Sequence, residues 1–136
     1  MKLTVLSPKE GAGGENVNED AMVLRLDYGA FGGLFTGDIG EKTEKILLED
    51  NQLSDVDLLK VGHHGSRYSS SRAFLEKIRP ELAIISCSEK NVYGHPSEET
   101  VERLELVGCR VEYTMESGAI TVESDGEKTE ITRFLA

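Results

Sequence analysis

The chain has 136 residues, of which 38% are hydrophobic and 29% are charged. These values are typical of one globular domain or a part of one, and they exclude a disordered or collagen-like chain. The formal net charge of −10 at pH 7 argues against a protein that grips nucleic acid through a broad basic surface, because an acidic surface repels phosphates. It leaves nucleases open, since bound metal ions supply local positive charge. The two cysteines lack a CxxC spacing and are predicted to be free thiols.

The predicted elements begin with antiparallel strands. Alternating apolar residues predict a strand at Leu3–Leu6 and a hairpin formed by Met22–Tyr28 and Phe31–Thr36. The segment Pro8–Asp20 between them is rich in glycine and is predicted to be a loop.

Helices and strands then alternate. Apolar periodicity and capping residues predict, in order, a helix at Glu41–Asp50, a strand at Val56–Val61, a helix at Ser70–Arg79, a strand at Leu82–Ser86 and a helix at Ser97–Val107. Three further strands follow at Val111–Thr114, Ala119–Glu123 and Lys128–Phe134. This order predicts an α/β fold with a mixed sheet and crossover helices.

Three loops that follow predicted strands contain all three histidines of the chain and an aspartate. They are Gly37-Asp38, the segment Gly62–Ser66 with His63 and His64, and Tyr93–Pro96 with His95. Ligands of open α/β sheets bind at the carboxyl ends of the strands, so we expect these loops to form one site. Histidine is both a metal ligand and a general acid or base near neutral pH.

Each candidate also has a structural interpretation. Asp38 either caps the helix that follows it or bridges two metal ions from a rigid strand end. His95 is either bonded to the backbone at a helix start or is a ligand to one metal. Neighbours on an extended segment point in opposite directions, so we expect only one of His63 and His64 to face the site.

The residues after the two histidines are polar or basic. Ser66 and the run Ser69–Ser71 are expected to cap the next helix. A serine nucleophile is the alternative, although the sequence contains no nucleophile elbow. Ser66 and Arg67 are the candidate substrate-binding residues, and Arg67 and Lys60 carry positive charge that could bind an anion.

Several motifs occur in an order that resembles a known family. The segments FTGD, LLKVGHHGS, LAIISCS, NVYGHPSEETVERL and SGAITVESDG are similar to the metallo-β-lactamase-like domain at the C-terminal end of ComEC competence proteins. The likeness extends from about Glu15 to Gly126, and the combination of GHHGS with YGHP is its specific part. It implies an αββα sandwich, a binuclear zinc or manganese centre and metal-assisted hydrolysis of phosphodiesters, with single-stranded DNA as the substrate.

The resemblance also assigns roles. It gives Asp38 the position of the carboxylate that bridges the metals, and His95 that of a histidine ligand to the second metal. His64, or otherwise His63, would either support the metal ligands from behind or donate a proton to the leaving oxygen. The main metal motif of the superfamily, HxHxDH, is absent, because no histidine precedes His63. Where a further histidine is expected, the sequence has Asn16, Asn18, Glu19 and Asp20.

The missing motif predicts that residues 1–136 are one metallo-β-lactamase-like domain without its N-terminal segment, or a non-catalytic relative that keeps the scaffold. Either version predicts weak or absent metal binding and no hydrolysis by this chain. Part of a sandwich would expose an apolar sheet face, so we expect a homodimer through that face.

The resemblance implies an extracytoplasmic domain of an integral membrane protein, in which this chain itself makes no membrane contact. Two other functions stay open. One is another hydrolase of the same superfamily, such as a phosphorylcholine esterase or a small phosphodiesterase. The other is a scaffold or binding module without catalysis.

Overall fold

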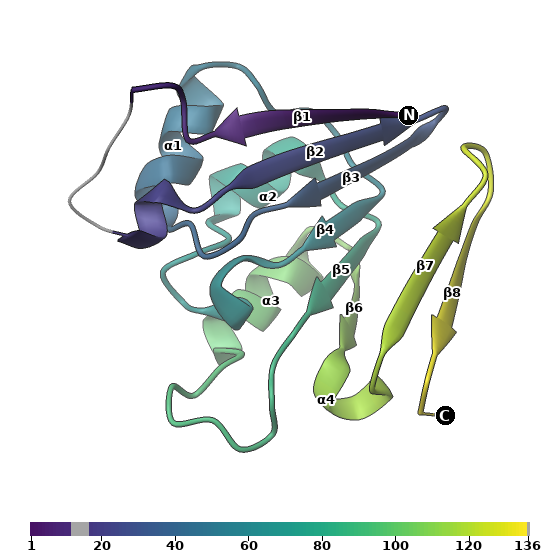
Figure 1. Cartoon of the computed structure of the whole chain (residues 1–136). Coiled ribbons are helices and arrows are strands. Elements are labelled where there is room, and N and C mark those ends of the chain that lie inside the picture. The colour runs from purple at the N-terminus through teal and green to yellow at the C-terminus, as the bar shows by residue number, and fades with distance from the viewer. Residues whose placement is uncertain (12–16, 136) are drawn as a thin grey trace.

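A six-stranded sheet forms the centre of the computed structural model, which describes residues 1–11 and 17–135 (Figure 1). The strands lie in the sheet in chain order: β1 (Lys2–Ser7), β2 (Val23–Tyr28), β3 (Phe31–Phe35), β4 (Leu58–Lys60), β5 (Leu82–Ile85) and β6 (Arg110–Tyr113). The first three strands are antiparallel, and β3 to β6 are parallel. The predicted mixed sheet is therefore confirmed.

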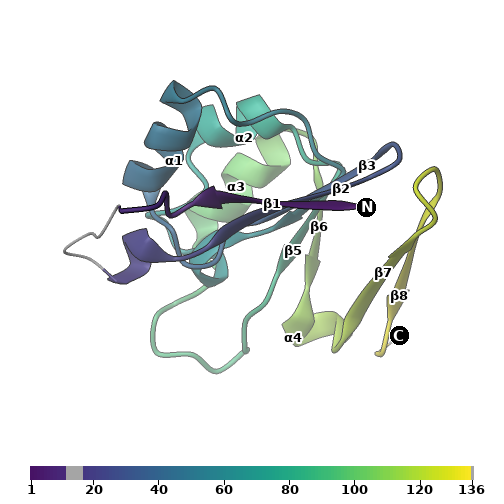
Figure 2. The ribbon, with the colours of Figure 1, turned by 45° about the horizontal axis from the view of Figure 1, so that its top comes forward.

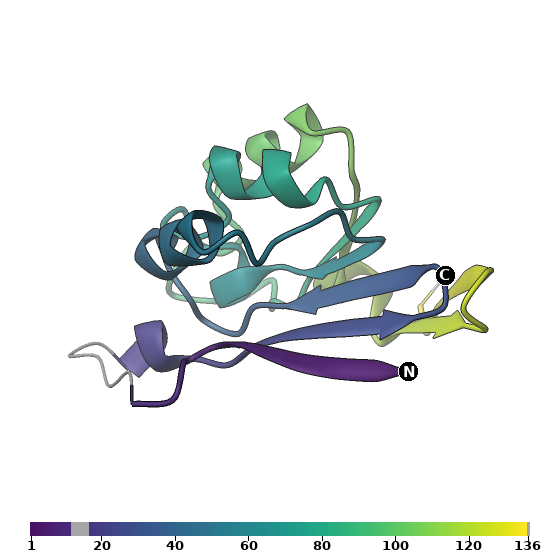
Figure 3. The same ribbon diagram turned by 90° about the horizontal axis from the view of Figure 1, so that it is seen from above.

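The helices α1 (Glu41–Glu49), α2 (Arg72–Ile78) and α3 (Glu98–Leu106) connect the parallel strands. All three cover the same face of the sheet, as Figure 3 shows. Leu34, Leu59 and Ala83 are register neighbours on β3, β4 and β5, and none of them is exposed. Together with Phe74 and Leu104 from the helices they form the apolar core, which fixes the carboxyl ends of the parallel strands.

The opposite face carries a separate hairpin, made of β7 (Ile120–Ser124) and β8 (Thr129–Arg133) (Figure 2). Hydrogen bonds from its second strand and from its turn hold it to the sheet. The buried Glu112 carboxylate on β6 accepts a hydrogen bond from Nε of Arg133 at 2.8 Å, and the Ala30 N–H donates to the Gly126 carbonyl at 2.6 Å. The outer strand β1 is left open on this face, where Leu3 is 60% exposed.

Several local predictions were wrong. Strand β4 covers only Leu58–Lys60 of the predicted Val56–Val61. A short 3₁₀ turn, η1 (Val17–Asp20), forms inside the predicted loop, and a helical turn, α4 (Thr114–Ser117), separates β6 from β7. In the described part of the chain, no helix is both long and apolar enough to cross a membrane.

Candidate functional site

The loops after β3, β4 and β5 are joined by hydrogen bonds. The N–H of His63 donates to the Gly37 carbonyl at 2.9 Å, and the N–H of Ser97 donates to the Gly65 carbonyl at 2.9 Å. A β-carbon at Gly65, whose φ is +81°, would lie 2.7 Å from Cβ of Pro96. Only glycine permits this approach, so the three loops form one continuous surface at the strand ends, as the sequence predicted.

Asp38 and the three histidines meet on this surface. Nε2 of His64 lies 3.9 Å from Oδ1 of Asp38. The rings of His63 and His95 pack edge to face with their centroids 5.6 Å apart, and the Tyr93 ring stacks on the His95 ring with a centroid distance of 5.8 Å. The sequence therefore identified residues that the fold brings together, although Tyr93 was named only as a loop position.

The backbone of His63 and His64 is left-handed, with φ values of 47° and 55°. They belong to a tight turn, η2 (Gly62–Gly65), and not to an extended segment. The expectation that only one of the two rings faces the site was therefore wrong. His63 contacts His95, and His64 lies beside Asp38.

A hydrogen bond fixes the His64 ring. Its Nδ1 lies 2.7 Å from the carbonyl oxygen of Ser86, just after β5. Since a carbonyl only accepts, Nδ1 carries the hydrogen. Nε2, on the side of Asp38, is then the ring atom left to hold or release a proton.

His95 is positioned by a neighbouring amide. Oδ1 of Asn91 accepts the His95 N–H at 2.9 Å, and Nδ2 of Asn91 donates to the His95 carbonyl at 2.6 Å. Burial lowers the pKa of His95, as do His63 and His64, while Asp38 opposes the shift. The ring is thereby favoured in the neutral form that binds metals. Asn91 was missed because nothing in the sequence marks an amide four residues away as a partner of His95.

The helix-capping roles considered for Asp38 and for the serines around Ser66 can be compared with the helix ends in the structure. Helix α1 begins after Gly40 without a side-chain cap, so Asp38 is not its cap. Ser71 accepts the Phe74 N–H and caps α2, as predicted for the serine run. Ser66 is only 2% exposed, and its hydroxyl accepts the N–H of Tyr68 at 3.3 Å, which is a structural role.

Arg67 lies at the rim of the same loop. Its side chain is exposed, and Nη1 lies 3.7 Å from Oε1 of Glu99 on α3. This ion pair turns the guanidinium toward the helix face. An anion that binds Arg67 would therefore compete with the Glu99 carboxylate for the guanidinium.

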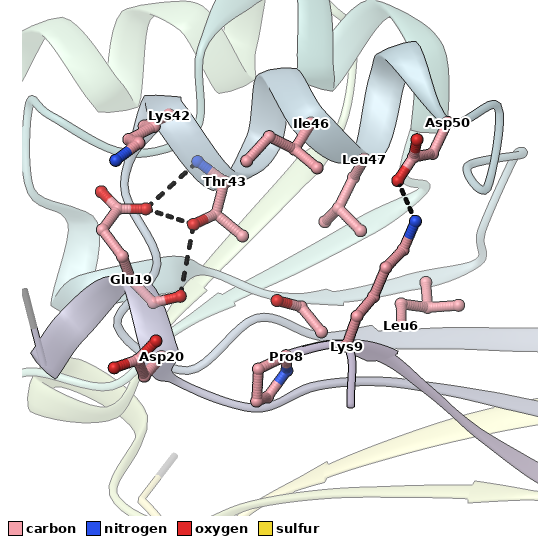
Figure 4. A pocket seen from close by; sticks show the side chains of 11 residues that line it. Leu6, Pro8, Lys9, Glu19, Asp20, Lys42, Thr43, Ile46, Leu47 and Asp50 are labelled. Atoms are coloured by element: carbon pink, nitrogen blue, oxygen red, sulfur yellow. Dashed lines mark hydrogen bonds and ion pairs between the residues drawn. The ribbon is translucent and has the colours of Figure 1, made fainter. Parts of the chain in front are cut away.

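Glu19, where the resemblance leads one to expect a further ligand, has a different role. Its carboxylate accepts the backbone N–H of Thr43 at 3.1 Å and also the Thr43 hydroxyl (Figure 4). These bonds supply the N-terminal cap that Gly40 cannot provide. The cavity in this region, of about 190 Å³, lies between β1 and α1. Asn16 lies outside the described residues, and the side chain of Asn18 is likewise not described.

The described residues do not form a complete metal centre. Within residues 1–11 and 17–135, no group of three or more histidine, cysteine, aspartate or glutamate side chains is arranged to hold a metal ion. Catalytic zinc sites normally use three protein ligands. Asp38 and His95, the two candidate ligands from the sequence, are fewer than that number.

Comparison with known proteins identifies relatives. ComE operon protein 3 from Bacillus subtilis is 32% identical over 88% of this chain. Recombination protein 2 from Haemophilus influenzae is 37% identical over 84%, and Competence protein ComA from Neisseria gonorrhoeae is 39% identical over 76%. The chain is related to ComEC-like competence proteins. No family model matches it.

The relationship covers a small share of these competence proteins. The chain spans 15% of the length of the B. subtilis protein and 14% of the H. influenzae protein. A further relative of unassigned function, YcaI from Escherichia coli, is 34% identical over 77% of the chain and is likewise covered for 14% of its length.

Proposed function

We propose that this chain is part of a metal-dependent hydrolase that cleaves phosphodiester bonds of single-stranded DNA during DNA uptake. The observation that carries the proposal is the meeting of Asp38 with three histidines at the carboxyl ends of parallel strands. It occurs in a chain that is 32–39% identical to competence proteins. The proposal includes an extracytoplasmic location for this domain.

The layer arrangement supports a metallo-β-lactamase-like sandwich. Helices cover one face of the six-stranded sheet, whereas a lone hairpin lies on the other face (Figure 2). In this proposal β7 and β8 belong to a second sheet layer. The remaining strands and metal ligands would come from segments of the hydrolase that correspond to parts of the relatives not matched by this chain.

The four side chains have three proposed roles. Asp38 and His95 supply a carboxylate and a neutral imidazole, two ligands that suit zinc or manganese. His64 keeps one nitrogen on the Ser86 carbonyl, so its other nitrogen is oriented to give a proton to a leaving oxygen. His63 packs against His95 and holds its ring in place.

A non-catalytic scaffold is the second candidate function. The observation that favours it is the lack of a three-residue metal group within the described residues. The two candidates differ in what the full-length protein does to DNA, because a scaffold would bind a partner without cleaving phosphodiester bonds.

The experiment is a cleavage assay on the full-length hydrolase of which we propose this chain is a part. It uses end-labelled single-stranded DNA in the presence of zinc, manganese or EDTA. We expect cleavage that requires metal and is lost in Asp38→Asn. The control is Asp55→Asn, which removes an exposed carboxylate paired with Arg79, outside the three loops. Absence of cleavage in every metal, or cleavage that persists in EDTA, would contradict the proposal.

A further inference from the structure

Lys60, named above only as a positive charge that could bind an anion, lies at the edge of the candidate site. It is the last residue of β4 and projects from the face that carries the hairpin, between its register neighbours Phe35 and Ile84. A cavity of about 370 Å³ lies there between the sheet and β7; its lining is mostly apolar, and Lys60, Ser86 and Thr114 are its polar lining residues. The side chain is half-buried.

The Lys60 ammonium has few partners. Nζ donates to the carbonyl of Val61 at 3.3 Å. None of the ion pairs formed among the described residues includes it, although the chain has 25 acidic residues. An ammonium carries three N–H donors, of which Lys60 uses one here, and the Asp38 carboxylate attracts its charge without forming an ion pair. The position therefore suits a lysine that receives an anion from outside the chain.

Hydrogen bonds connect residues of the cavity to the candidate site. Ser86, which lines the cavity, holds His64 through its carbonyl oxygen. On the other side, the hydroxyl of Thr36 donates to the Lys60 carbonyl at 2.9 Å, which ties the end of β4 to the chain two residues before Asp38. An anion bound by Lys60 would thus lie beside the residues assigned to hydrolysis.

We propose that Lys60 binds a phosphate group of single-stranded nucleic acid next to the candidate site. This rests on the proposed function, which makes a phosphodiester the substrate. A lysine ammonium is a compact point charge that binds phosphate oxygens without a fixed geometry. Lys60 would therefore offset locally the repulsion that the net charge of −10 exerts on DNA.

The test measures binding of a thymidine oligonucleotide to this chain by fluorescence anisotropy at low salt. Two probes are compared, one with phosphodiester linkages and one with uncharged methylphosphonate linkages. We expect Lys60→Gln to weaken binding of the charged probe about tenfold and to leave the neutral probe unchanged. Lys60→Arg should keep most of the charged-probe affinity. The control, Lys45→Gln, alters a lysine on α1 whose side chain is 77% exposed.

Three outcomes would overturn the inference. They are equal binding of the charged probe by wild type and Lys60→Gln, equal weakening of both probes, and equal loss in Lys45→Gln. An unchanged Lys60→Gln in a full-length protein that cleaves DNA would refute the role of Lys60 and leave the proposed function intact. A full-length protein that cleaves no DNA would refute the proposed function, whatever the binding result.

Discussion

The imidazole ring of His64 connects two strand ends. Its Nε2 lies 3.9 Å from Oδ1 of Asp38, which follows β3, and its Nδ1 lies 2.7 Å from the carbonyl oxygen of Ser86, which follows β5. The residue itself follows β4, so it spans three neighbouring strands of the sheet. Because Nδ1 is held by a carbonyl, proton exchange with a substrate is restricted to Nε2. This restriction supports the proposed role of His64 as a proton donor.

Asn91→Ala should loosen the loop that carries His95. The variant removes three hydrogen bonds, two to the His95 backbone and one to the Ser88 carbonyl. Each is worth about 1 kcal/mol, and we expect faster amide hydrogen exchange at His95. Val92→Ala is the control, because that side chain is 92% exposed. Equal exchange at His95 in both variants would show that Asn91 does not position it.

Glu44→Gln should destabilise the fold by about 1–3 kcal/mol. The buried Glu44 carboxylate accepts the N–H groups of Ser70 and Ser71, and Ser70 is left-handed. An amide offers only one oxygen, so one buried N–H would face an NH₂ group. Urea denaturation measures the free energy of unfolding.

The matched control for this change lies on the same helix. Glu49→Gln alters a side chain that is 65% exposed and should change the free energy of unfolding by less than about 0.5 kcal/mol. If both variants are equally stable, Glu44 does not anchor the loop between β4 and α2.

The two cysteines should differ in reactivity. Burial raises the pKa of Cys109 to about 11, and the residue is 8% exposed. At pH 8 only about one Cys109 thiol in a thousand is ionised, and the thiolate is the reactive form. Alkylation by iodoacetamide, followed by mass spectrometry, should therefore modify the less buried Cys87 first, with the Cys109 rate rising as the pH approaches 11. Equal rates at pH 8 would contradict the packing of Cys109.

The open sheet face should make this chain self-associate. Leu3 and Val5 on β1 are 60% and 55% exposed, and they pair in register with Leu26 and Leu24 on β2. Paired residues of antiparallel strands share a face, so these four apolar side chains form one patch. Light scattering should show a dimer, and the double change Leu3→Thr and Val5→Thr should give a monomer. A wild-type monomer would contradict dimerisation through this face.

Sequence patterns predicted the strands and helices because apolar periodicity reflects burial on one face. The same argument failed at His63 and His64, where backbone bonds to neighbouring loops impose a left-handed turn. It also missed Glu19 and Glu44, because each carboxylate binds backbone more than 20 residues away. The positions of the candidate residues at the strand ends were predictable from the strand order, whereas their pairing depends on contacts between distant segments.

The most direct test of the central claim is calorimetric titration of this 136-residue chain with zinc and manganese, together with the Asp38→Ala variant. We propose that the chain supplies only a part of a binuclear ligand set. We therefore expect weak or absent metal binding, and no cleavage of single-stranded DNA by the chain alone. Tight binding of two ions per chain, or robust DNA cleavage by the chain that is lost in Asp38→Ala, would contradict it.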